Sequence, residues 1–284
     1  MAAITLRLCR ENQLQLPDKI TPYLPAEWME GLHIYHGKDY SKDITVNHLL
    51  TQTSGLPCYL IGKRPAAPKL MDVLQSKEQE WSAEQVVAQV KQMKPLFRPG
   101  QRGKANYTNT NFRLLAKVLE TVTGQTIDKL LTSLFNQLGL RHTYVLSPGE
   151  ERTYTPVYFK EKRVSLPRYL ASSGYDIVST ARDQMTFLKA FFDGYFYPKE
   201  QLQEEAQWNP VFFPFKYGKG MQQFYIPRIL SPFKPFPPMI GHAGSTGSFG
   251  FWIPARNVFI TGTINQSANP NLAFQTMVKI INQL

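Results

Sequence analysis

The residues with the clearest chemical potential are a tyrosine, an asparagine and a histidine in two separate segments. Tyr107 and Asn109 lie in PGQRGKANYTNTNF (99–112), and His242 lies near the start of GHAGSTGSFGFW (241–252). A phenol has an ordinary pKa near ~10, so it acts as a base at neutral pH only where nearby positive charge lowers that pKa. A histidine changes charge near neutrality and suits acid–base chemistry. The alternative is that these residues are structural. Tyr107 and Asn109 would then be turn residues before a helix, and His242 would be a residue at the start of a strand.

Helical patterns dominate the chain before these segments and between them. Residues 2–10 carry apolar positions at helical spacing and begin at Met1 in full pattern without a cap, which indicates the rear half of a helix. A short helix is expected over 45–53, stopped by the Gly and Pro that follow. Further helices are expected after the capping box of Ser82 and Gln85 up to Pro95, from Phe112 to a stop at Gly124, and after a cap at Thr180. Another helix is expected to start with Ile127, Leu130, Leu131 and Leu134.

The pattern changes from about residue 212, where aromatic and β-branched residues alternate with Gly and Pro. Residues 248–253 and 257–264 are expected to be strands joined by a turn. Asn269 and Pro270 are expected to start a last helix. Its predicted buried face comprises Ala273, Met277, Ile280, Ile281 and Leu284. Helices followed by strands and a terminal helix indicate an α+β fold.

The composition describes a globular protein with a core. Hydrophobic residues make up 43% of the 284 residues and charged residues 19%. The net charge of +11 is compatible with anionic partners or with a role in solubility alone, but no nucleic-acid module is visible.

The cysteines and histidines do not indicate a disulfide or metal framework. Two cysteines, Cys9 and Cys58, are too few for a disulfide-rich scaffold or a zinc ribbon, and a metal pair of His33 and His36 is not expected in their glycine-flanked loop. Residues 1–12 show no signal-peptide pattern, so we expect a soluble chain and leave its localisation open.

Three segments in this order resemble the serine β-lactamase, penicillin-binding-protein and related esterase superfamily, and most closely its class C-like branch. They are ITVNHLLTQTSGLP (44–57), PGQRGKANYTNTNF (99–112) and GHAGSTGSFGFW (241–252). Supporting similarities are the LxLPDKI exit (14–20), SSGYDIVSTARDQ (172–184) and YGKGM (217–221). The resemblance runs from the first residues to the last helix. It implies a β-lactamase/transpeptidase-like α+β fold, with a helical lobe and an antiparallel sheet flanked by helices.

The resemblance also implies an active site built from three elements: SxxK on a helix, YxN, and KTG or HxG on a strand. Tyr107 and Asn109 match YxN, in which the tyrosine would relay protons and the asparagine would orient the substrate or the lysine. His242 and Gly244 match HxG, in which the glycine leaves room for substrate. The backbone N–H of Ser245 would be one of two oxyanion donors. Because histidine replaces the lysine of KTG, esterase or peptidase-like activity is favoured over penicillin binding.

The SxxK nucleophile motif is absent from this sequence in a helical context. By register with the family it is expected just before Met1, so the chain would be N-terminally incomplete and would lack the first strands of the fold. Ser231 and Lys234 fit the letters of SxxK, but the surrounding prolines prevent the helix that would align them. Ser54 lies in a turn that stops a helix, where a structural role is expected.

We therefore expect a β-lactamase-related serine hydrolase that acts through an acyl-serine on esters, amides or peptides, and that is inactive as residues 1–284. One alternative is a non-catalytic pseudoenzyme that binds a carboxylate or peptide ligand in the same cleft. Another is a basic adaptor for an acidic partner. No metal or organic cofactor and no nucleic-acid partner are expected, while cell-envelope association and oligomeric state stay open. The helical lobe is expected over 1–212, and sheet strands with the C-terminal helix over 213–284.

Overall fold

The computed structural model describes residues 1–61, 81–147, 154–164, 175–204, 207–230, 236–269 and 271–283. Outside these ranges lie four features considered above: the pair Ser231 and Lys234, Pro270, Leu284, and residues 172–174. Within the described ranges, no helix combines the length and the apolar character that a membrane span requires.

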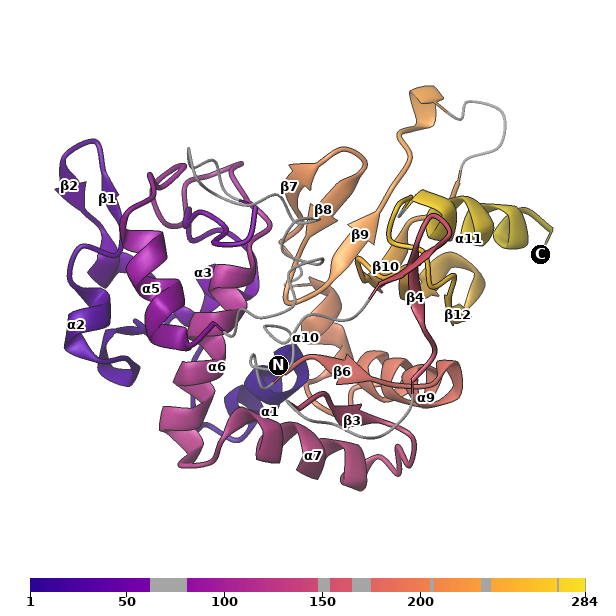
Figure 1. Ribbon diagram of the computed structural model, residues 1–284, viewed down its shortest axis with the longest axis horizontal. Coiled ribbons are helices and arrows are strands. Elements are labelled where there is room, and N and C mark those ends of the chain that lie inside the picture. Colours follow the sequence, from indigo (N-terminus) through magenta and orange to yellow (C-terminus); the bar gives the residue numbers. More distant parts are fainter. Residues whose placement is uncertain are drawn as a thin grey trace.

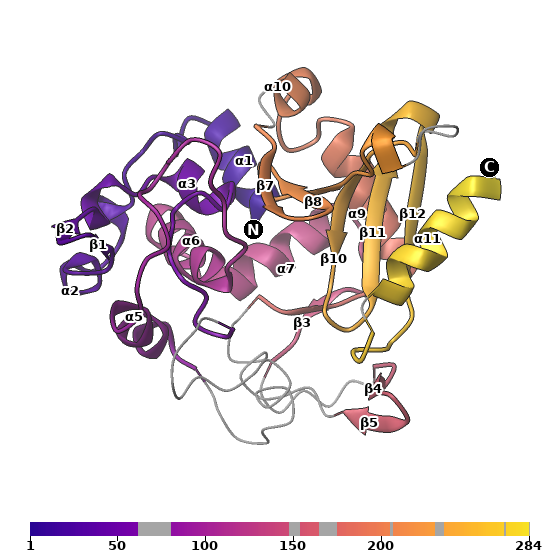
Figure 2. The same cartoon turned by 90° about the horizontal axis from the view of Figure 1, so that it is seen from above.

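A six-stranded antiparallel sheet forms the C-terminal part of the structure, in the order β12-β11-β10-β9-β8-β7 (Figures 1 and 2). The strands expected over 248–253 and 257–264 are confirmed as β11 and β12. Strands β7 to β9 have three or four residues each, too few for alternation to identify them in the sequence. The bounds are β7 Asn209–Phe212, β8 Phe215–Tyr217, β9 Gln222–Phe224, β10 Met239–Ala243, β11 Ser248–Ile253 and β12 Val258–Thr263. The division into two lobes stays a prediction.

Helix α11 (Asn271–Gln283) covers one face of the sheet, as Figure 2 shows. Its residues Ala273, Met277 and Ile281 are buried in a cluster with apolar side chains of β9, β10 and β11, which confirms most of the expected apolar face. Ile280 was wrongly included, because its side chain is 42% exposed. The buried stripe advances by four residues at a time, and Ile280 falls beside it.

The first expected helix is confirmed as α1 (Ala2–Arg10), and it lies inside the main core. Ile4 of α1 is fully buried. Helix α9 (Ala181–Phe192) lies against the other face of the sheet, where the ring of Phe192 is 4.8 Å from that of Trp252. The same hydrophobic cluster contains all three side chains, so one continuous core joins α1, α9 and the sheet.

Two predicted helix starts and one predicted helix stop are confirmed. Ser82 and Gln85 form the expected capping box, Thr180 accepts from the backbone N–H of Asp183 at 3.1 Å, and Gly124 ends a helix at φ +68°. Helix α5 already ends at Lys91 and does not reach Pro95. The bounds are α2 Ala26–Met29, α3 Val46–Leu50, α5 Ala83–Lys91, α6 Asn109–Thr123, α7 Ile127–Gln137 and α10 Lys199–Glu204.

The described residues also form three short two-stranded ladders outside the main sheet. The pair β1–β2 is a tight hairpin that turns at residues 36 and 37. His33 is fully buried just before this hairpin, whereas His36 is exposed in its turn, so the two histidines have different surroundings. The bounds are β1 Ile34–Tyr35, β2 Lys38–Asp39, β3 Tyr144–Val145, β4 Val157–Phe159, β5 Lys162–Val164 and β6 Ile177–Val178, with β3 paired to β6 and β4 to β5.

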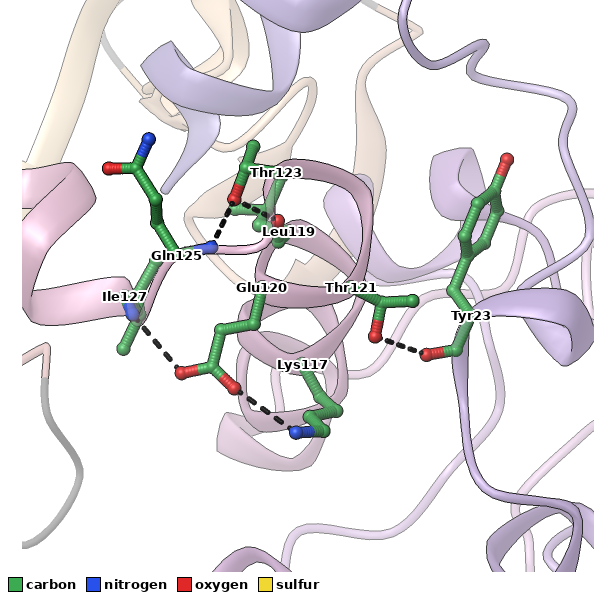
Figure 3. Close-up of polar contacts among 8 residues, drawn as sticks. All are labelled: Tyr23, Lys117, Leu119, Glu120, Thr121, Thr123, Gln125 and Ile127. Carbon is green, nitrogen blue, oxygen red and sulfur yellow. Dashed lines mark hydrogen bonds and ion pairs between the residues drawn. The ribbon is translucent and has the colours of Figure 1, made fainter.

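The end of α6 is tied to its neighbours by polar contacts (Figure 3). One carboxylate oxygen of Glu120 accepts from the backbone N–H of Ile127 at 3.1 Å, and the other lies 3.5 Å from the ammonium of Lys117. The hydroxyl of Thr121 donates to the carbonyl of Tyr23 at 2.8 Å. An acidic side chain at the first turn of α7 also suits the helix dipole. These contacts fix α6, whose other end carries Asn109.

Helix α3 begins at a capping box that contains a histidine. The Oγ1 of Thr45 accepts from the backbone N–H of His48 at 3.2 Å, and the Nδ1 of His48 accepts from the backbone N–H of Thr45 at 3.2 Å. This second bond requires an unprotonated Nδ1. Burial, and then the charge of Lys19, lower the pKa of His48 to about 4.

We expect the protein to lose stability in acid through His48. In the unfolded chain its pKa is about 6.5, so between about pH 6.5 and pH 4 the unfolded state binds more protons than the folded state. The contribution of His48 is therefore full above this window and decreases as the pH falls, by about 2 kcal/mol at pH 5. Urea unfolding of wild type and His48→Gln at pH 7 and pH 5 measures it. Glutamine keeps an acceptor at this position and does not titrate.

The expected result is a smaller acid loss in His48→Gln than in wild type. The exposed His36 supplies the control, since His36→Gln should lose as much stability as wild type. An equal loss in wild type and His48→Gln would contradict the assignment.

Candidate active site

The structure brings Tyr107 and His242 together. Their ring centroids are 5.9 Å apart, although Tyr107 precedes α6 and His242 lies on β10. Tyr217, at the end of β8, completes a cluster of three rings, 5.7 Å from Tyr107 and 6.1 Å from His242. The YGKGM similarity includes this tyrosine, but nothing in the sequence indicated that its ring meets the other two.

Strand β10 carries His242 at a place where two strands approach closely. Gly241 precedes it and pairs with Phe251 of β11 and Gln222 of β9. A Cβ atom at Gly241 would lie 2.0 Å from the carbonyl oxygen of Gly250. Glycine is therefore required for the normal spacing of β10 and β11, and that spacing determines where His242 lies.

Beyond β10 the chain makes a tight turn that exposes two predicted site residues. The backbone N–H of Gly244 donates to the carbonyl of Ser248 at 2.8 Å, and that of Gly247 donates to the carbonyl of Gly244 at 3.0 Å. Gly244 and Ser245 are exposed, and His242 is partly buried. The residues expected to bind the substrate carbonyl thus lie at the open end of the strand.

The segment that carries Tyr107 is held by a buried glutamine that the sequence argument missed. The Oε1 of Gln52 accepts from the backbone N–H of Thr108 at 3.0 Å and from the side-chain amide of Asn111 at 2.7 Å. Its Nε2 donates to the carbonyl of Thr108 at 3.3 Å, and it is also hydrogen-bonded to the phenol of Tyr217. Gln52 therefore connects the segments of two rings of the cluster. The TQTSGLP similarity was the signal that could have pointed to it.

Ser54 and Asn109 occupy different surroundings. Ser54 is fully buried, donates from Oγ to the Oδ1 of Asn111 at 2.6 Å, and accepts from the backbone N–H of Leu56 at 3.1 Å. These bonds place Ser54 in the turn after α3, as expected for a structural residue. Asn109 is the first residue of α6, directly after the cap Thr108, and is partly exposed.

Burial keeps both predicted acid–base residues neutral at pH 7. It raises the pKa of Tyr107 to about 12, with smaller effects from Cys58 and Asp176. It lowers the pKa of His242 below its ordinary value. Because burial disfavours the protonated imidazole, His242 does not supply the positive charge that would lower the pKa of Tyr107. The pair can donate and accept hydrogen bonds as a neutral phenol and a neutral imidazole.

Among the residues that the structure describes, no group of three or more His, Cys, Asp or Glu side chains is arranged to hold a metal ion.

A helical part and an antiparallel sheet covered by helices, with the segments that resemble YxN and HxG in contact, agree with the class of β-lactamase-fold hydrolases. The family model described as Beta-lactamase matches residues 1–279, so the chain belongs to this family. The expected superfamily and α+β fold are thereby confirmed.

Solved structures and curated proteins give particular relatives. A D-stereospecific amidohydrolase from Streptomyces sp. is 27% identical, with a TM-score of 0.71 over 94% of this chain and 79% of that one. A D-amino acid amidase from Ochrobactrum anthropi SV3 has a TM-score of 0.71 over 99% of this chain and 81% of that one, and at 20% identity it shows the fold alone. Protein flp of Staphylococcus aureus (strain COL) is 28% identical over 139 residues, which are 49% of this chain and 24% of that protein.

Proposed function

We propose that this chain forms the substrate-binding part of an acyl-serine hydrolase that acts on neutral esters or amides, esterase or peptidase-like and not a true β-lactamase. The observation that carries the proposal is the contact of Tyr107 with His242 at a ring distance of 5.9 Å, between the segments that resemble YxN and HxG. The family contains hydrolases of this fold, and the likeness to a D-stereospecific amidohydrolase supports an amide of an amino acid as substrate.

Each proposed site residue has a role that its position allows. The exposed N–H of Ser245, at the open end beyond Gly244, would donate to the developing oxyanion. Tyr107 and Asn109 would hydrogen-bond the leaving group and the substrate amide. His242, neutral at pH 7, would supply a second hydrogen bond. Since neither Tyr107 nor His242 is charged, this pair of side chains suits a neutral carbonyl group better than the carboxylate ligand of the non-catalytic alternative.

The binding prediction is that residues 1–284 take up the enantiomers of phenylalanine amide saturably and with different affinities. Tyr107→Phe removes one hydrogen bond and should weaken binding about three- to tenfold, since a typical hydrogen bond contributes about 0.5 to 1.5 kcal/mol. His242→Ala should weaken it at least as much. Titration calorimetry measures both, and Tyr195→Phe is the matched control, because Tyr195 is 46% exposed.

Turnover separates the catalytic from the non-catalytic interpretation. Because no serine–lysine pair on a helix is evident in this sequence, residues 1–284 should hydrolyse neither nitrocefin nor p-nitrophenyl butyrate above background. Robust turnover that disappears when one serine within 1–284 is replaced would overturn this expectation. Binding that both Tyr107→Phe and His242→Ala leave unchanged would overturn the proposed site.

A further inference from the structure

A cavity of about 530 Å³ lies next to the proposed oxyanion strand end. Gly244 and Ser245 border it, and buried apolar side chains of α7 and of the residues after it, Leu131, Leu134 and Leu140, line it. Figures 1 and 2 show α7, β3 and the N-terminal end of α1 grouped together in this region. Its volume is within the range of ligand-binding pockets.

The charged side chains that line this cavity are all acidic. Two carboxylates, Asp176 and Asp183, are among the lining residues, and no Lys or Arg is, although the whole chain carries a net charge of +11. The amino terminus of Met1 also lines the cavity, but burial lowers its pKa to about 6, so it is mostly neutral at pH 7. The carboxylate of Asp183 accepts from the backbone N–H of His142 at 2.8 Å and from the hydroxyl of Thr143 at 2.9 Å. A negatively charged group is therefore disfavoured here.

We propose that this cavity is the subsite for an apolar group of the substrate, uncharged or cationic, that lies beside the reacting carbonyl. The occupant is the aliphatic or aromatic part of an amide or ester, and a carboxylate is excluded. The inference rests on the proposed function, because the carbonyl has to lie at Gly244 and Ser245 for the apolar group to reach α7.

A ligand series tests this subsite on residues 1–284. Acetamide, butanamide and hexanamide are titrated together with adipic acid monoamide and 6-aminohexanamide, which keep the amide and carry a carboxylate or an ammonium at the far end of the chain. Ligand-observed NMR reaches the millimolar dissociation constants expected. Burial of each added methylene should tighten amide binding about fourfold until the cavity is filled. 6-Aminohexanamide should bind at least as tightly as hexanamide, because its ammonium meets the lining carboxylates, and adipic acid monoamide should bind more weakly than either.

Two variants block the cavity in different ways. Thr155→Trp adds bulk at an exposed lining position, and Leu134→Trp fills the space from α7. Both variants should abolish the increase in amide affinity with chain length and leave the affinity for acetamide unchanged. Ile229→Trp is the control, since Ile229 is 85% exposed and is not among the lining residues. Should Leu134→Trp fail to fold by its thermal melt, Thr155→Trp carries the test.

The outcomes distinguish the subsite from the proposed function. Binding that depends on Tyr107 but not on chain length, or adipic acid monoamide binding as tightly as hexanamide, overturns the subsite alone. Length-dependent binding that Thr155→Trp leaves intact also overturns it. Length-dependent binding that Tyr107→Phe does not weaken overturns the proposed function while the subsite stands. Absence of binding throughout the series overturns both.

Discussion

Gly241→Ala is expected to lower the free energy of unfolding by about 3 kcal/mol or more. The added Cβ would lie 2.0 Å from the carbonyl oxygen of Gly250 and 2.7 Å from the Cα of Phe251. Both atoms belong to the backbone of β11, so no side-chain rotation relieves the clash. The strands have to separate, which breaks the ladder that holds His242 opposite Tyr107. Guanidinium unfolding followed by fluorescence measures the loss.

A second glycine supplies the control for this substitution. Gly37 lies in the β1–β2 turn at φ +77° with no atom within 4 Å of an added Cβ. Gly37→Ala should cost about 1 kcal/mol, from backbone strain alone. A Gly241→Ala protein within 1 kcal/mol of wild type would show that β10 and β11 are not held at the described spacing.

Gln52→Leu is expected to destabilise the protein by about 3 kcal/mol and to impair ligand binding in the protein that still folds. The substitution leaves the backbone groups of Thr108 and the amide of Asn111 buried without their partner, and each such loss costs about 1 to 3 kcal/mol. Gln52 has a left-handed backbone at φ +62°, where glutamine and leucine are strained to a similar degree, so the expected loss comes from the broken hydrogen bonds. Gln125→Leu, on an exposed position, should be close to neutral.

The binding readout distinguishes positioning from bulk stability. At a temperature where Gln52→Leu is still folded by circular dichroism, the affinity for phenylalanine amide should fall at least as much as in Tyr107→Phe. Gln52→Asn tolerates the left-handed conformation but is shorter, so it should restore stability in part and binding hardly at all. Wild-type affinity in folded Gln52→Leu would leave Gln52 with a purely structural role.

The helices could be predicted from the sequence because their signals are local. A capping box such as Ser82 with Gln85 lies within one turn, and Gly124 ends α6 through its own backbone conformation. The strands β7 to β9 could not be, since runs of three or four residues do not establish a period of two. Ile280 was misassigned because a four-residue spacing alone does not show where the edge of a helix face lies.

Only the site residues that lie in sequence motifs could be predicted from the sequence. Tyr107, Asn109, His242, Gly244 and Ser245 stand in recognisable patterns, and the structure adds that two of their rings meet. The neutral state of that pair depends on burial, which no spacing shows. The role of Gln52 depends on contacts with a segment more than fifty residues later, and a sequence pattern does not encode such partners.

The place of α1 in the core has a consequence for how the chain acquires its structure. Ala2 packs so closely against Gly220 that an added Cβ at the glycine would lie 2.2 Å from the alanine Cβ, and the guanidinium of Arg10 donates to the carbonyl of Tyr195. Contacts between distant parts of a sequence form late and slowly. On the ribosome α1 is made long before these partners, so its apolar side chains stay uncovered during most of translation and offer chaperones a binding site.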